Sequence, residues 1–128
     1  MNLIMGLLFG LAVGGIMRAP GAEFVTAANA VNLSVMAALW LGISFAPQQP
    51  RKAIIVETCT ATATFVIAAL VFQHSALWLY AGFAFQAFWS AAHIGNRIGV
   101  SSQTWYPGFA AMVNLGFIAA LYAVRTFA

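Results

Sequence analysis

The feature that most constrains this chain is a series of five apolar runs, each bounded by a short polar break. The runs cover residues 2–17, 24–46, 53–72, 76–92 and 108–124. An α-helix crosses a bilayer core about 30 Å thick with roughly 17–25 apolar residues. None of the runs alternates strictly between apolar and polar positions, as a half-buried strand would. The sequence therefore predicts an all-α integral membrane protein: a compact single-domain bundle of about five transmembrane helices, with four as the alternative.

The scarcity of charge excludes several other classes of protein. The 128 residues include five Lys or Arg and two Asp or Glu, 5% of the chain, whereas a soluble domain carries about 25% charged residues. So few charges cannot cover a water-facing surface, which excludes a soluble globular domain and a disordered chain. The five cations are scattered, so they form no basic patch and nucleic acid is not an expected partner.

The cations also give a prediction of orientation. With five spans, Arg18 and Arg125 lie on one side of the membrane, and Arg51, Lys52 and Arg97 lie on the other side together with the N-terminus. The positive-inside rule then predicts a cytoplasmic N-terminus, in a bacterial cytoplasmic membrane. The difference is one charge, so dual topology stays open. No Lys or Arg precedes the first apolar run, so we expect a retained helix rather than a signal peptide.

A stripe of small residues on the first helix indicates close helix packing. Gly6, Gly10 and Gly14 recur every four residues and so share one face, which lets another helix approach closely. The partner is either a helix of the same chain or the same helix of a second copy. The stripe therefore predicts helix-packing roles for these glycines and leaves a homo-oligomer as one of two interpretations.

Polar side chains gather in one leaflet of the predicted bundle. Glu57 is the only acid within a span, and an ionisable group there is a candidate functional residue. Gln86, Ser90 and His93 share one face of the fourth helix. Counted along their helices, Glu57, Ser90, His93 and Asn114 all lie about 0–10 Å from the same interface. We therefore expect Glu57 and His93 to approach each other, with Asn114 beside them.

The second helix adds two buried amides. Asn29 and Asn32 lie one turn apart, and side chains this deep need hydrogen-bond partners. They either line a cavity or bond to a neighbouring helix. With Glu57 and Asn114 they could form a discontinuous polar track across the bilayer.

No motif names a reaction, a metal or a cofactor. His74 and His93 lie at opposite ends of the fourth helix, about 28 Å apart, and cannot share a metal ion. No metal-ligand spacing, nucleophile motif or phosphate loop occurs. We therefore predict no metal site and no catalytic residue, and leave the cofactor unknown. Cys59, the only cysteine, lies in an apolar run and is expected to be buried and unreactive.

The segment from Gly95 to Pro107 is the longest polar connection, and it is either a binding loop or a solvated linker. Three functions fit the whole pattern. The first is a small, homo-oligomeric membrane protein that binds or passes a small solute or ion through its polar cluster. The second is a non-catalytic accessory subunit of a larger membrane complex, with the polar cluster as a structural knot. The third is a membrane enzyme acting on a lipid or quinone, with His93 and Glu57 as acid and base. A protein without enzymatic activity is favoured, with membrane lipids and either further copies or other membrane subunits as its partners.

Overall fold

The computed structural model describes residues 2–16, 22–95, 98, 100 and 102–127, and these residues form five α-helices joined by loops, with no strand among them. In chain order the helices are α1 (Asn2–Ile16), α2 (Ala22–Ser44), α3 (Arg51–Gln73), α4 (Trp78–Ala92) and α5 (Tyr106–Phe127). Each helix end lies within three residues of the corresponding predicted run. The all-helical bundle predicted from the apolar runs is therefore confirmed.

Proline and glycine mark the breaks between helices. Pro50 precedes α3 in an extended conformation, with φ −71° and ψ 147°. Pro107 is the second residue of α5, where a missing N–H breaks no intrahelical hydrogen bond. Gly95 follows α4 with φ 77°, in the left-handed region that favours glycine. Pro50 in the α2–α3 connection and Gly95 in the α4–α5 connection thus lie where the chain leaves the helical conformation.

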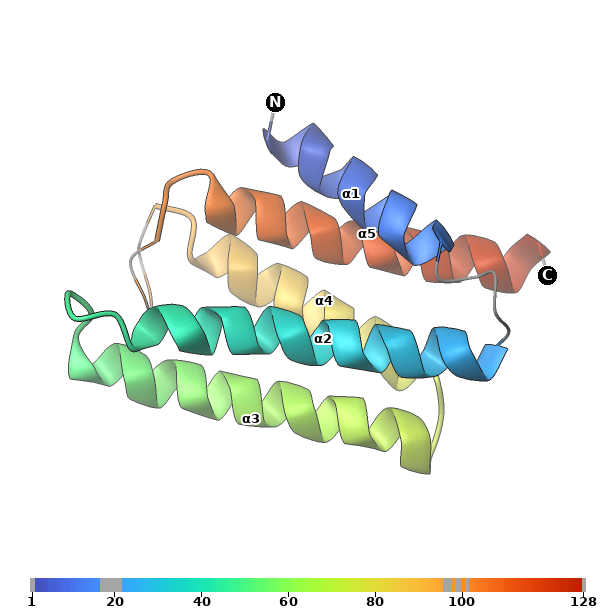
Figure 1. Ribbon diagram of the computed structural model, residues 1–128, viewed down its shortest axis with the longest axis horizontal. Helices are drawn as coiled ribbons and strands as arrows, with labels where there is room; N and C mark the ends of the chain where they lie inside the picture. Colours follow the sequence, from blue (N-terminus) through green and yellow to red (C-terminus); the bar gives the residue numbers. More distant parts are fainter. Residues whose placement is uncertain (1, 17–21, 96–97, 99, 101, 128) are drawn as a thin grey trace.

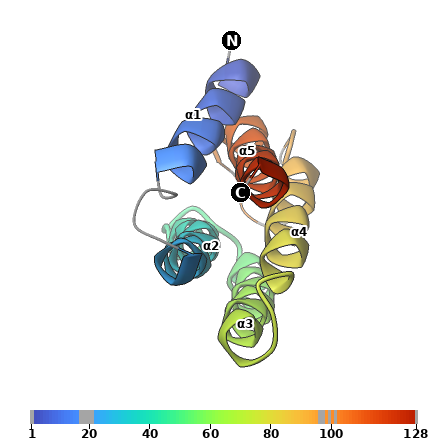
Figure 2. The ribbon, with the colours of Figure 1, turned by 90° about the vertical axis from the view of Figure 1, so that its right-hand side faces the viewer.

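The helices pack largely antiparallel, and α1 lies across α5 (Figures 1 and 2). Helix α3 packs against both α2 and α4, and α4 packs in turn against α5. The end of α2, the start of α3, the end of α4 and the start of α5 lie at the same end of the bundle (Figure 1). We call this the Arg51 end, because Arg51 is exposed there at the start of α3.

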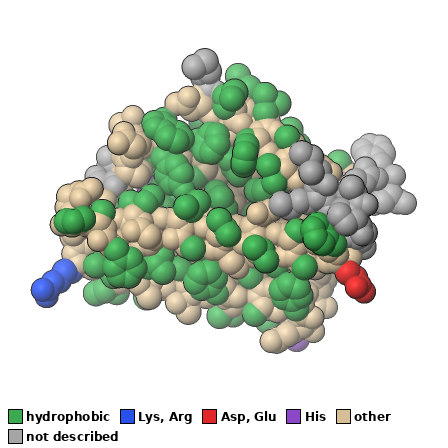
Figure 3. Space-filling model, viewed as in Figure 1, with side chains coloured by type: hydrophobic (Ala, Val, Ile, Leu, Met, Phe, Trp, Pro, Cys, Tyr) green, Lys and Arg blue, Asp and Glu red, His purple; other side chains and the backbone are tan. Residues whose placement is uncertain are grey.

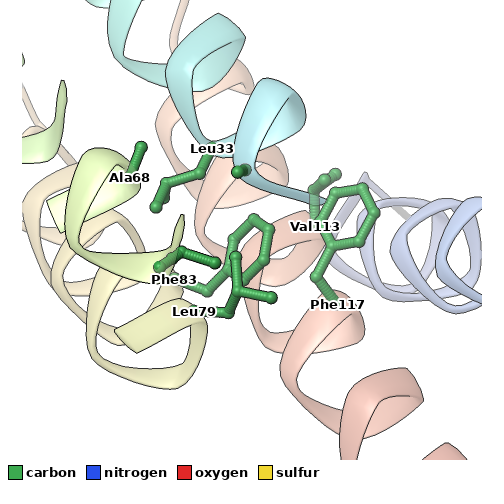
Figure 4. Packing of buried hydrophobic residues seen from close by; sticks show 8 residues of the cluster. Leu33, Ala68, Leu79, Phe83, Val113 and Phe117 are labelled. Atoms are coloured by element: carbon green, nitrogen blue, oxygen red, sulfur yellow. The ribbon is translucent and has the colours of Figure 1, made fainter. Parts of the chain in front are cut away.

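An apolar core joins α2, α3, α4 and α5 in the middle of the bundle. Phe83 of α4 and Phe117 of α5 stack with their ring centroids 4.9 Å apart. Around them lie buried aliphatic side chains from all four helices, as Figure 4 shows: Leu33, Ala68, Leu79 and Val113. This core separates the Arg51 end of the bundle from the opposite end.

The glycine stripe of α1 packs against α5 within the same chain. A methyl group at Gly6 would lie 2.5 Å from the carbonyl oxygen of Phe109, and one at Gly14 would lie 2.7 Å from Cβ of Ala120. At Gly10 a methyl group would collide with the backbone of Val113 and lie 3.0 Å from Cα of Gly116. The stripe therefore permits backbone contact between α1 and α5, which is the first of its two interpretations.

Within the described residues, three helices are long and apolar enough to cross a membrane. They are residues Glu23–Ser44, Arg51–Gln73 and Tyr106–Ala123, of 22, 23 and 18 residues. Helices α1 and α4 have 15 residues each, which corresponds to about 22 Å and is shorter than the bilayer core. The structure thus supports three crossing helices by length and composition, and a fivefold crossing stays a prediction.

Apolar side chains are spread over the outside of the bundle. Phe88 is 70% exposed, and Ile55 and Ile4 are similarly open. On the face in Figure 3 the charged side chains lie at the two ends of the long axis, with basic side chains at one end and acidic ones at the other. Cys59 is also exposed, so the expectation that it is buried was wrong. It follows the buried Glu57 by two residues, which places it about 200° around α3.

Candidate functional site

A buried pair of ionisable side chains lies at the Arg51 end. Glu57 is on the second turn of α3, and His93 is the residue that caps the end of α4. Because α3 and α4 run antiparallel, these positions meet. Nε2 of His93 lies 2.8 Å from Oε1 of Glu57, and the two side chains are 0% and 1% exposed. The structure thus brings together the acid and the imidazole that the sequence placed in one leaflet.

Trp89 completes a closed ring of contacts around this pair. Its indole N–H donates to Oε2 of Glu57 over 3.0 Å. Its backbone oxygen lies 2.8 Å from Nδ1 of His93, one turn further along α4. Both carboxylate oxygens and both ring nitrogens therefore have partners, as the burial of such polar groups requires.

These contacts fix where protons can lie. A carbonyl oxygen only accepts hydrogen bonds, so Nδ1 of His93 carries a proton and donates it to the Trp89 carbonyl. A hydrogen bond across the Nε2–Oε1 contact then needs one further proton. Either a protonated Glu57 donates to a neutral ring, or an imidazolium donates to the carboxylate. The geometry therefore holds one proton that has two alternative positions, and the pair carries no net charge in either.

Trp40 of α2 covers one face of the His93 imidazole. Its ring stacks on His93 with centroids 4.3 Å apart and an interplanar angle of 28°. Its indole N–H donates to Oγ of Ser90 over 3.2 Å. Trp40 is 1% exposed and Ser90 is 0% exposed. Stacking on His93 and hydrogen bonding to Ser90 thus hold α2 against this side of the pair.

A second polar contact joins the same two helices further inside. Nε2 of Gln86 donates to Oγ1 of Thr64 over 2.7 Å. Thr64 follows Glu57 by seven residues and Gln86 precedes His93 by seven, which places this contact about 10 Å deeper along the α3–α4 interface. Oε1 of Gln86 is buried without a hydrogen-bond partner. The α3–α4 interface therefore carries polar contacts at two levels that lie two helical turns apart.

The predicted asparagines do not join the pair. The amide nitrogen of Asn114 donates to the backbone oxygen of Ala110 in its own helix. It lies eight residues after the start of α5, about 12 Å along the helix, whereas His93 is at the very end of α4. Asn29 likewise donates to Val25 of its own helix, while Asn32 is half-buried on α2. The amide oxygens of Asn29 and Asn114 are buried without partners.

Three aromatic residues belong to the site although no sequence pattern assigned them to it. Trp40 and Trp89 contact the imidazole, and the ring of Tyr106 lies 5.1 Å from that of Trp40. One signal was available, since Trp89 precedes His93 by one helical turn and so shares its face. No comparable signal marks Trp40.

The site has few groups that could hold a metal. No cluster of three or more His, Cys, Asp or Glu occurs among the described residues. Glu57 and His93 alone supply two such side chains, already bonded to each other. Comparison of the chain with protein-family models, with curated proteins and with solved structures gives no match.

Proposed function

We propose that the chain is an integral membrane protein that binds a proton at the Glu57–His93 pair and moves that proton, or a small solute coupled to it, through the bundle. The observation that carries the proposal is the pair's geometry. One proton occupies the 2.8 Å contact between Nε2 and Oε1, and its two positions differ only in which residue holds it. A buried acid–base pair of this kind is the arrangement that proton relays in membranes use.

The surroundings of the pair support a proton rather than a larger ion at this point. The two side chains are fully buried and in direct contact, which leaves no space between them for a hydrated cation. Both positions of the proton leave the pair neutral, so transfer within it creates no net charge in an apolar setting. The Thr64–Gln86 contact continues the polar interface inward. The amide oxygen Oε1 of Gln86 has no partner, so it can accept a hydrogen bond from a donor such as water.

The proposed setting is the bacterial cytoplasmic membrane, with the N-terminus in the cytoplasm. The exposed Arg51 and Lys52 at one end support this orientation, while Arg18 and Arg97 lie outside the described residues. Lipids, or further copies of the chain, would cover the apolar surface. The glycine stripe gives the oligomer no support, because α5 occupies it.

Proton movement in lipid vesicles tests the proposal. The purified chain is reconstituted with a trapped pH-sensitive dye, and a potassium diffusion potential drives protons inward. We expect the wild type to acidify the vesicles faster than empty vesicles do, and Glu57→Gln to abolish the difference. Glu23→Gln is the matched control, because Glu23 is exposed at the other end of the bundle. Equal rates for the wild type and Glu57→Gln would contradict the proposal.

A structural accessory role is the second candidate. It is favoured by the complete hydrogen bonding of the pair, since Glu57, His93 and Trp89 satisfy one another without any outside group. In that role the contacts would only hold α3 and α4 together within a larger complex of other membrane subunits. The vesicle experiment separates the two functions, because a structural knot gives no proton movement in the wild type.

A further inference from the structure

The two positions of the proton shared by Glu57 and His93 differ in charge. With the proton on Glu57 both side chains are neutral, and with it on Nε2 of His93 the contact is an imidazolium–carboxylate ion pair. Burial opposes the charged forms of both groups, and the two side chains are 1% and 0% exposed. The ion pair therefore prevails only if neighbouring groups stabilise both of its charges.

The carboxylate end of the pair receives a second donor. The indole N–H of Trp89 donates to Oε2 of Glu57 over 3.0 Å. A hydrogen bond to an ionised acceptor is about twice as strong as one between neutral groups, so this bond is strongest when Glu57 is a carboxylate. Within the described chain, the other charged side chains at this end are Arg51 and Lys52, which are exposed on the same helix and positive. These neighbours thus stabilise a negative charge on Glu57.

The imidazole end of the pair lies at the C-terminus of α4. The backbone N–H of His93 bonds to the carbonyl oxygen of Ser90 over 3.2 Å, and the carbonyl oxygen of Trp89 lies 2.8 Å from Nδ1 of the ring. The carbonyl groups of the last helical turn carry the partial negative charge of the helix dipole. A positive charge on the ring of His93 is therefore stabilised at this position.

Trp40 adds a contact that acts on the charge alone. Its ring stacks on the imidazole with centroids 4.3 Å apart and an interplanar angle of 28°, so a charge on His93 lies over the face of the indole. Such a face attracts a cation within about 6 Å, and most strongly where water is excluded. Trp40 donates its N–H to Ser90 and makes no hydrogen bond with Glu57 or His93. Its replacement therefore removes no hydrogen bond of the pair.

We infer that the pair rests as an imidazolium–carboxylate ion pair and that Trp40 is the positioning residue that keeps the proton on His93. The three contacts at the two ends of the pair all favour this position over the neutral one. The inference deepens the proposed function and rests on it for its role in proton movement. An incoming proton then binds a carboxylate oxygen of Glu57, and the pair carries one positive charge until either residue releases a proton.

NMR of the full chain in detergent, with nitrogen-15 in the histidine rings and carbon-13 in the glutamate carboxyls, tests the inference. The chain has two histidines and two glutamates, so His74→Gln and Glu23→Gln assign the signals. An imidazolium carries a proton on both ring nitrogens, and a neutral ring on one. At pH 7 we expect His93 to be imidazolium in at least about nine-tenths of the molecules, with Glu57 as a carboxylate.

Variants of Trp40 test its role in holding the proton. Trp40→Leu should lower the ratio of imidazolium to neutral ring about tenfold, to about one half of the molecules, because the attraction of the indole for the charge is lost. Trp40→Phe keeps a ring with a weaker attraction, and it should lower the ratio about threefold. Trp78→Leu, at the opposite end of α4, is the matched control and should leave the ratio unchanged.

Each outcome decides the inference. A neutral His93 beside a protonated Glu57 in the wild type overturns it, and so does an unchanged ratio in the Trp40 variants. If Trp40→Leu does not fold, Trp40→Phe decides alone. The vesicle experiment separates this result from the proposed function. An ion pair in a wild type that moves no protons would refute only the proposed function, and proton movement with a neutral pair would refute only the resting ion pair.

Discussion

The α1–α5 interface and the α3–α4 interface hold helices together by opposite means. Between α1 and α5 glycines let the two backbones touch, and Gly10 meets Gly116 backbone to backbone. Between α3 and α4 polar contacts bridge the helices at two levels. At the outer level Glu57 bonds to His93 and Trp89, and at the inner level Thr64 bonds to Gln86. The first interface depends on shape, which tolerates no added atom, and the second depends on paired groups, which tolerate no missing partner. Mutations should therefore act on the two interfaces in different ways.

The largest expected effect is on the buried pair. Glu57→Gln and His93→Gln should each lower the free energy of unfolding in detergent by about 3 kcal/mol, because each leaves a buried partner unsatisfied. The double variant should cost less than the sum of the single variants by about 1 kcal/mol or more. Thermal unfolding of the four proteins measures this coupling. Strict additivity would show that the two residues do not depend on each other.

The next largest effect is on the glycine seam. Gly10→Leu should destabilise the chain by about 1–3 kcal/mol or more, because the side chain meets the backbone of α5. Gly15→Leu is the matched control on the same helix, since nothing lies within 4 Å of a side chain there. The two variants are compared by melting temperature and by the yield of folded protein. Equal melting temperatures and equal yields of the two variants would show that the glycine face of α1 does not pack against α5.

A smaller effect is expected at the inner polar contact. Gln86→Leu should cost about 0.6 kcal/mol, the average for a polar contact between membrane helices. Oγ1 of Thr64 would lose its donor from α4 but keep its bond to the backbone of Thr60. Thr62→Val is the control, because Thr62 bonds only within α3. A loss as large as that of Glu57→Gln would mean that the inner contact holds α3 to α4 as strongly as the outer pair does.

The smallest effect is expected at Cys59. Its side chain is exposed on α3, so Cys59→Ser should leave the melting temperature unchanged within error. A small membrane-permeable maleimide should label the wild type without unfolding it. Protection that disappears when excess detergent dilutes the chains among micelles would mean that a second copy or another subunit covers this face of α3, because detergent covers it in both cases.

How much of this structure the sequence predicts depends on whether the signal is local. The helices follow from apolar runs and from proline and glycine at their ends, which act on adjacent residues. The Glu57–His93 pair could be predicted because both residues are rare in apolar helices and their depth follows from counting along the chain. The glycine stripe predicted a close contact but not its partner, α5.

The remainder depends on which helix lies next to which. Trp40 reaches His93 only because α2 packs beside α3 and α4 at the Arg51 end, and no pattern within α2 records that neighbour. Asn114 was expected beside the pair because only its depth was considered. Its amide instead bonds back to Ala110 one turn earlier, an alternative that any asparagine in a helix has available.

The central claim is that the Glu57–His93 pair exchanges a proton with the surrounding water. Nitrogen-15 NMR of histidine-labelled protein measures this directly, because the chain contains only two histidines, His74 and His93. The exposed His74 serves as the internal reference and is assigned with His74→Gln. We expect the ring N–H of His93 to exchange its proton with solvent deuterium, and Glu57→Gln to change that exchange while leaving His74 unaltered. A His93 ring proton that stays protected while that of His74 exchanges would show a sealed, purely structural pair and contradict the account.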